Sequence, residues 1–201
     1  NKIYEIIPED ELFDLQNKVY KKEKKRYDLK LTKEEKKFIK NHKPIKVGGE
    51  EDWAPFDFVD VSGKYQGIAK DYLNLISEMS GLKFNVITGD TWNELLKKFK
   101  NKKLDMLPVL YYAKDRESFT NYTKPYFQLN QFFFIREDEK NIQDIESLNG
   151  KTLSVIDGYY TVELLKKEYP KIKLDLVKNV THCLNNVIQK ISDACIEALT
   201  P

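Results

Sequence analysis

The cysteines and histidines of this 201-residue sequence could support catalysis or metal binding, but their spacing argues against both. Cys183 and Cys195 do not form a CxxC pair, and the only histidines, His42 and His182, lie far apart along the chain. A structural zinc site is therefore not expected. The cysteines could pair in an oxidising compartment or remain free as small buried hydrophobic residues, and free cysteines are the favoured interpretation.

The short motifs of known catalytic sites are also missing from the sequence. It contains no GxSxG, no Walker loop and no HExxH, and Lys151 after Gly150 lacks the glycine spacing of a phosphate-binding loop. We therefore expect a binding protein with no catalytic residues, no metal and no cofactor.

One turn has the character of an anion-binding site. The residues Asp157-Gly158-Tyr159-Tyr160 stand between an apolar run and an amphipathic run, where we expect a strand to lead into a helix. Backbone N–H groups at the start of a helix favour a negatively charged group. The turn is therefore a candidate contact for a polar ligand.

The composition limits the partners that these residues can have. Lys and Arg total 34 against 32 Asp and Glu, so the net charge is +2 and no nucleic-acid partner is expected. Hydrophobic residues make up 41% of the chain, which is enough for a core. The sequence has no run of about 18 apolar residues and no signal peptide at its start.

Strand and helix patterns alternate from Ile45 onward, which predicts an α/β fold with parallel-rich sheets flanked by helices. The helix over 68–79 places Ile68, Tyr72, Leu75, Ile76 and Met79 on one face and ends at Gly81. Strands are predicted at 45–47, 84–87, 104–107, 132–135, 153–156, 172–177 and 194–196, a hairpin at 56–64, and further helices after Thr91, at 160–168 and at 180–190.

The alternation occurs in two runs joined near residues 126–130, which predicts two lobes on either side of a cleft. We assign 45–129 to lobe 1 and 130–201 to lobe 2. Residues 1–44 form a helical extension with an amphipathic helix over 7–20, a basic linker from Lys21, and a short helix that starts with a Thr32/Glu35 capping box.

Several motifs in register resemble the bacterial extracellular solute-binding proteins of family 3. They are Lys46-Val47-Gly48, Asp52-Trp53-Ala54-Pro55-Phe56, Gly63 to Tyr72, Leu104 to Pro108, Asp115-Arg116, Leu148-Asn149-Gly150-Lys151 and Ser192-Asp193-Ala194. The resemblance covers about residues 31–201 and implies a two-lobed Venus-flytrap fold. Members of this family continue beyond the last of these motifs, so we expect lobe 2 to be incomplete in this chain.

The segment ahead of lobe 1 resembles the approach to flytrap sensor domains in membrane-bound histidine kinases and diguanylate cyclases. Leu31, Thr32, Glu34, Glu35, Ile39, His42 and Pro44 carry this likeness. Such domains occur in tandem, and the helix over 7–20 is similar to the closing helix of a preceding flytrap. The resemblance thus implies a periplasmic or extracytoplasmic sensor domain whose membrane-anchored output domain lies outside this chain.

The resemblance assigns ligand contacts residue by residue. Arg116 falls where amino-acid binders hold the ligand carboxylate, and its planar guanidinium suits that role. Trp53 and Phe56 fall at the positions of stacking aromatic residues. Glu50 falls where some binders of cationic amino acids place an acid for the ligand's ammonium group.

Three departures from the family pattern weaken the assignment of an α-amino acid. Tyr159 stands where amino-acid binders commonly carry Thr, and Tyr111 stands where many carry Ser or Thr. The acid that pairs with the ligand amine would fall near Ala198, and Glu197 lies one residue away. Either the ligand is not an α-amino acid, or Glu197 and Glu50 take over that role.

These residues predict extracytoplasmic binding of a small polar solute, an amino acid or a related carboxylate, by a sensor domain that could form oligomers. The first alternative is a free binding subunit of an ABC-type amino-acid importer. The second is an enzyme on the same fold, such as a cyclohexadienyl or arogenate dehydratase, which would need a general acid that no residue here clearly supplies.

Overall fold

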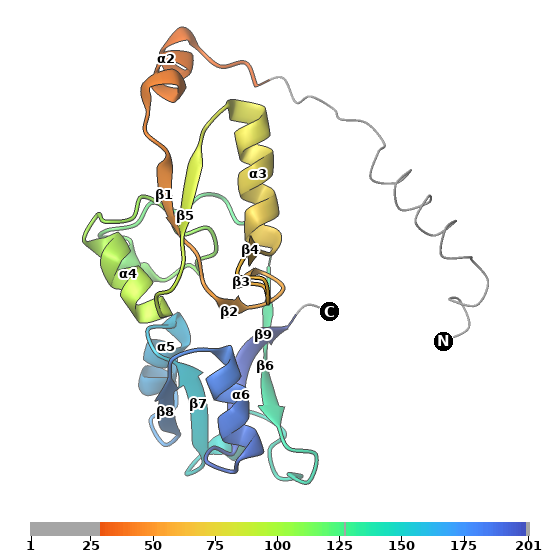
Figure 1. The fold of residues 1–201 in the computed structure, drawn as a ribbon. Coiled ribbons are helices and arrows are strands. Elements are labelled where there is room, and N and C mark those ends of the chain that lie inside the picture. Colours follow the sequence, from red (N-terminus) through yellow and green to blue (C-terminus); the bar gives the residue numbers. More distant parts are fainter. Residues whose placement is uncertain (1–28, 127, 200–201) are drawn as a thin grey trace, which may run out of the picture.

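The computed structural model describes residues 29–126 and 128–199 of the chain (Figure 1). The predicted helix over 7–20 and the basic run after it lie outside the described residues. The short helix ahead of lobe 1 is confirmed as α2 (Lys33–Asn41). Its start is fixed locally, because Thr32 accepts a hydrogen bond from the Glu35 amide while the Glu35 carboxylate accepts one from Thr32.

The first lobe is the part of the molecule in Figure 1 that contains β1 to β5, α3 and α4. Its two longest strands run parallel, and a small antiparallel sheet in the order β2-β3-β4 follows β1 along the chain. Both of its helices have the predicted ends, since Gly81 takes a left-handed conformation at φ 83° and Thr91 forms a capping box. The elements are β1 (Ile45–Gly48), β2 (Asp52–Trp53), β3 (Asp57–Val59), β4 (Tyr65–Gln66), α3 (Ile68–Ser80), β5 (Phe84–Ile87) and α4 (Trp92–Lys100).

The second lobe is one four-stranded sheet in the order β6-β9-β7-β8. The strand β6 is antiparallel to β9, whereas β7 runs parallel to both β8 and β9. The two helices α5 and α6 each follow a strand, as in repeated βαβ units. The elements are β6 (Asn130–Ile135), β7 (Thr152–Ile156), α5 (Tyr160–Glu168), β8 (Lys173–Val177), α6 (Val180–Ile188) and β9 (Ala194–Leu199).

The prediction of a strand at 104–107 is wrong. This segment makes only a single parallel bridge, between Met106 and Val47. The side chain of Asp105 accepts the hydrogen bond of the Lys46 amide, a donor that a neighbouring strand would otherwise use. Pro108 then ends the segment, because it has no N–H group to continue a ladder.

The buried face predicted for α3 is also wrong in part. Ala69 and Leu73 are the buried residues of this helix, whereas Tyr72 and Leu75 are 39% and 45% exposed. The helix packs on β3 and β4, and its apolar stripe is wider than the part that is buried. A sequence pattern shows that a helix has an apolar side but not how much of that side its neighbours cover.

The interpretation of free cysteines is wrong as well, because Cys183 on α6 and Cys195 on β9 form a disulfide. Both residues are fully buried, and their Cα atoms lie 5.6 Å apart. The packing of α6 against β9 creates this proximity. The disulfide therefore joins two elements of the second lobe, close to Glu197.

A continuous hydrophobic core crosses from one lobe to the other. It combines residues of α4 and the following segment of the first lobe with residues of β7, the turn before α5, β8, α6 and β9 of the second. The two lobes are therefore packed against each other rather than separated by an open cleft. The buried members are Trp92, Leu95, Leu104, Leu107, Ile156, Tyr159, Val177, Cys183, Val187 and Cys195.

Candidate functional site: a closed cleft between the lobes

The turn before α5 contacts the first lobe through its backbone. The carbonyl oxygen of Gly158 accepts hydrogen bonds from the Trp92 indole at 3.0 Å and from the Arg116 guanidinium at 2.7 Å. The neighbouring Asp157 carboxylate accepts a hydrogen bond from the side-chain amide of Asn93 at 2.6 Å. Gly158 has φ 81°, and a Cβ atom there would lie 3.3 Å from the Trp92 ring. Glycine thus permits both the turn and the close approach of the lobes.

A second contact holds the lobes together at the start of α6. The Asp52 carboxylate on β2 accepts hydrogen bonds from the Thr181 amide at 2.8 Å and from the Thr181 hydroxyl at 2.9 Å. Asn179 caps the same helix by accepting a bond from the His182 amide. A carboxylate near the start of a helix is favoured by the exposed N–H groups there. The two lobes are therefore joined by direct hydrogen bonds at two places.

Aromatic rings fill the space between these contacts. The ring of Tyr159 lies 5.7 Å from Trp92, edge to face, and 6.2 Å from Trp53. Tyr111 lies 5.1 Å from Tyr160 and 6.1 Å from Trp53. The space left among these rings is about 10 Å³, which is about the size of one water molecule. The cleft is closed, and protein side chains occupy it.

Two acidic side chains, Glu50 and Glu197, lie at the cleft, and a third, Asp57, lies near Glu50 in the first lobe. Burial raises the pKa of Glu197 to about 7 and that of Asp57 to about 6. Burial raises the pKa of Glu50 well above its ordinary value, and the nearby Asp57 and Glu197 carboxylates raise it further. Of the ion pairs between described residues, none includes these three acids. The cleft therefore holds acids in a low-dielectric setting without cationic partners.

Arg116 is the one cationic residue lining the cleft within the described part of the chain. It is only 5% exposed, and its guanidinium lies 6.0 Å from the centre of the Trp92 ring. Its hydrogen bond to the Gly158 carbonyl crosses from the first lobe to the second. Burial lowers the pKa of Arg116, although the group stays charged at neutral pH.

Three buried polar atoms at the cleft lack a hydrogen bond of normal length to any described residue. They are the indole nitrogen of Trp53, the hydroxyl oxygen of Tyr111 and one carboxylate oxygen of Glu197, Oε2. The Trp53 indole lies near enough to the Glu197 carboxylate to lower the pKa of that acid, against the larger effect of burial. The other carboxylate oxygen of Glu197 accepts the Ala198 amide at 2.7 Å. Unpaired polar atoms are costly inside a protein, so a ligand that pairs with them would gain stability from these contacts.

The structure brings together most of the residues that the sequence predicted for the site. Phe56 is the exception, because it is buried in the core of the first lobe, with its ring 5.1 Å from Trp53, and does not line the cleft. Asp157 and Gly158 contact the first lobe through the bonds described above. The predicted residues that line the cleft are Glu50, Trp53, Tyr111, Arg116, Tyr159 and Tyr160, and Glu197 lies beside them.

Sequence reasoning missed Trp92, Asn93, Asp52 and Thr181 as residues that contact the opposite lobe. The signal for Trp92 and Asn93 was present, because they follow the Thr91 cap and so stand in the first turn of a helix that comes directly after a strand. Side chains in this position of an α/β unit face the carboxyl ends of the strands, where ligands bind. The Asp52–Thr181 pair had no such local signal.

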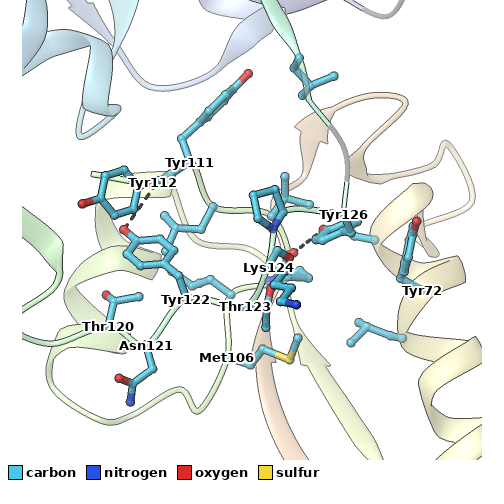
Figure 2. Close-up of a pocket in the computed structure, with 18 of the residues that line it drawn as sticks. Tyr72, Met106, Tyr111, Tyr112, Thr120, Asn121, Tyr122, Thr123, Lys124 and Tyr126 are labelled. Carbon is cyan, nitrogen blue, oxygen red and sulfur yellow. Dashed lines mark hydrogen bonds between the residues drawn. The ribbon is translucent and has the colours of Figure 1, made fainter. Parts of the chain in front are cut away.

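A larger groove of about 930 Å³ lies on the first lobe beside α3 (Figure 2). Figure 2 shows Tyr112 and Tyr122 at one end of it and Tyr126 and Tyr72 at the other. Its walls are mostly aliphatic and aromatic, and it contains none of the three buried acids. We therefore take the interlobe cleft, which combines charge with enclosure, as the candidate site.

Two α/β lobes closed on a polar cleft define a solute-binding domain with the periplasmic-binding-protein fold. The sequence comparison agrees, because the profile of the bacterial extracellular solute-binding proteins, family 3, matches residues 45–197. The chain belongs to this family.

Among its relatives are two bacterial sensors. The chain is 28% identical over 163 residues to the virulence sensor protein BvgS of Bordetella bronchiseptica, covering 81% of the chain and 13% of the sensor. It is 26% identical over 168 residues to the sensor protein EvgS of Escherichia coli O157:H7, covering 84% and 14%. The chain therefore spans about an eighth of the length of these sensors.

A solved relative supports the same assignment. The crystal structure of the periplasmic VFT2 domain of Bordetella pertussis BvgS superposes with a TM-score of 0.71 at 26% identity, covering 83% of this chain and 71% of that one. The fold is thus the Venus-flytrap fold of sensor periplasmic domains. In the part of the chain that the structure describes, no helix has the length and apolar character needed to cross a membrane.

Proposed function

We propose that this chain binds a small solute with a positively charged nitrogen, an amino acid or a related compound, in the interlobe cleft. The observation that carries this proposal is the group of buried acids without a cationic partner. A buried carboxylate is costly unless a charge compensates it. A ligand ammonium group near Glu50 and Glu197 would supply that charge and would pair with the Oε2 atom of Glu197, which has no hydrogen bond of normal length to a described residue.

Arg116 supports a carboxylate on the same ligand. The guanidinium group has five N–H donors, and the Gly158 carbonyl accepts from one of its terminal nitrogens. Its other donors remain available for a planar carboxylate. A solute with both charges would thus bridge Arg116 on the first lobe and Glu197 on the second, and each lobe would gain contacts only in the closed state.

We further propose that the domain serves as an extracytoplasmic sensor of a membrane receptor. The likeness to BvgS and EvgS supports this role, as does the closed cleft, because a ligand shifts an equilibrium between states by its difference in affinity for them. An output domain attached to the membrane, outside this chain, would respond to the shift.

Paired probes that differ by one charged group test the ligand chemistry. We would titrate the full chain by calorimetry with L-arginine and agmatine, with L-lysine and cadaverine, and with succinate and glutarate. We expect the amino acids to bind most tightly, the amines more weakly and the dicarboxylates least. Binding of the dicarboxylates alone would contradict the role of the acids, and no binding by any probe would contradict an amino-acid or amine ligand.

Two variants separate the charges. Arg116→Ala should weaken binding of L-arginine much more than binding of agmatine, because only the first probe carries a carboxylate, whereas the lost bond to the Gly158 carbonyl affects both probes alike. Glu197→Gln should weaken both probes. Glu163→Gln, an exposed change on α5, is the matched control and should bind like the parent. If Arg116→Ala binds L-arginine as tightly as the parent does, Arg116 is not a ligand contact.

A further inference from the structure

We infer that Tyr159 is a built-in occupant of the cleft, whose side chain keeps the two lobes closed without a solute and must leave before a solute can enter. This inference rests on the proposed binding site, since it concerns the same cleft. It adds a specificity-determining residue: a solute binds only if its contacts outweigh those that the tyrosine gives up.

The position of the ring is the first argument. Tyr159 belongs to the second lobe, but its ring contacts Trp53 and Trp92 of the first lobe and is only 7% exposed. Its hydroxyl donates a hydrogen bond to the Glu50 carboxylate at 3.3 Å. With the ring in place, about 10 Å³ is left, so a solute larger than a water molecule cannot share the cleft with it.

The residue type at this position is the second argument. Tyr159 is the N-cap residue of α5, and its side chain makes no capping hydrogen bond. Ser, Thr, Asp and Asn are preferred at N-caps because their side chains accept a bond from the helix backbone. A tyrosine forgoes that bond, so local helix stability does not explain the residue. Its hydrogen bond to Glu50 and its contacts with the rings of Trp53 and Trp92 cross the cleft.

The contact with Glu50 is the third argument, because it matches what a solute would offer. The tyrosine hydroxyl is a neutral donor to a carboxylate that burial makes hard to ionise. A ligand ammonium group would be a stronger, charged donor to the same oxygen atoms. A solute whose ammonium group replaces the hydroxyl would therefore bind Glu50 more strongly than the tyrosine does. This gain in binding free energy would favour displacement of the ring, and the cleft would remain closed around the solute.

The two tryptophans of the chain make this inference testable. Trp53 and Trp92 are the only ones in the sequence, and both contact Tyr159, so tryptophan fluorescence reports on the cleft. Trp53 also borders the groove beside α3, and the control variant below lies in that groove. We expect acrylamide to quench the parent weakly and the Tyr159→Ala variant severalfold more strongly. Small-angle X-ray scattering should show a larger radius of gyration for the variant. Tyr112→Ala, a change of a 59% exposed tyrosine outside the cleft, is the control and should match the parent.

Chemical rescue distinguishes an occupant of the cleft from a residue needed for folding. The compound p-cresol has the shape of a tyrosine side chain, so it should restore weak quenching and the smaller radius to Tyr159→Ala and leave the parent unchanged. Tyr159→Phe keeps the ring and loses the bond to Glu50, so it should remain closed with intermediate quenching. This variant decides the case if Tyr159→Ala does not fold.

Three results would overturn the inference: a parent that is already open in scattering, a Tyr159→Ala variant as compact and as weakly quenched as the parent, or a Tyr159→Phe variant that is fully open. A different result would show that the proposed function is wrong while this inference holds. Neither the parent nor Tyr159→Ala would then bind L-arginine or agmatine, but the variant would still open. If both proposals hold, Tyr159→Ala binds agmatine more tightly than the parent, because no ring has to be displaced.

Discussion

Glu197 should make the stability of this protein depend on pH, and the size of the effect follows from its burial. The carboxyl is 4% exposed, and burial raises its pKa from an ordinary value of 4.5 to about 7. The folded state therefore holds the proton more tightly than the unfolded state does. Stability is highest below pH 4.5, falls as the pH rises through about 7, and is constant above that for this group.

The magnitude comes from the difference between the two pKa values. One pKa unit corresponds to about 1.4 kcal/mol, so the full loss from Glu197 is about 3 kcal/mol. Between pH 5 and pH 8, both within a practical range, the loss is roughly 2 to 3 kcal/mol. Glu197→Gln removes the ionisable group and should remove this share of the pH dependence. The same substitution removes the repulsion by which Glu197 raises the pKa of Glu50, so it should also reduce the contribution of Glu50 to the pH dependence of stability.

Urea denaturation at pH 5 and pH 8 measures the effect. We expect the parent to lose at least 2 kcal/mol more of its free energy of unfolding between these pH values than Glu197→Gln does. Glu78→Gln, on the exposed side of α3, is the control and should follow the parent. Equal pH dependence of the parent and Glu197→Gln would refute the reasoning, because Glu197 would then not be buried as an acid.

Two further predictions concern the disulfide and the turn before α5. Reduction of the Cys183–Cys195 disulfide, or Cys195→Ser, should lower the free energy of unfolding by about 3 kcal/mol, because the bond closes a loop with a sequence separation of 12; identical urea curves with and without dithiothreitol would contradict this. Gly158→Ala should cost about 1 kcal/mol for its positive φ and also increase acrylamide quenching, because the new methyl group would crowd Trp92. Gly63→Ala has a similar φ of 77° with no atom within 4 Å of the new methyl group, so it should show the loss of stability without the change in quenching.

The sequence by itself determined the elements of the fold, because their signals are local. The capping boxes of Thr32 and Thr91 and the left-handed Gly81 involve residues within a few positions of one another, and the structure confirms all three. The family resemblance then placed Trp53, Arg116 and the turn at 157–160 around one cleft. The residue boundaries of the two lobes remain a prediction.

Only the tertiary structure decided how these elements meet. The pairing of Cys183 with Cys195 depends on the packing of α6 against β9, and the contact between Asp52 and Thr181 joins residues 129 positions apart. Phe56 shares the aromatic character of Trp53 but packs in the core. Burial, and with it the raised pKa of Glu197, arises only when both lobes close, because a sequence pattern specifies which side of an element is apolar and not what covers it.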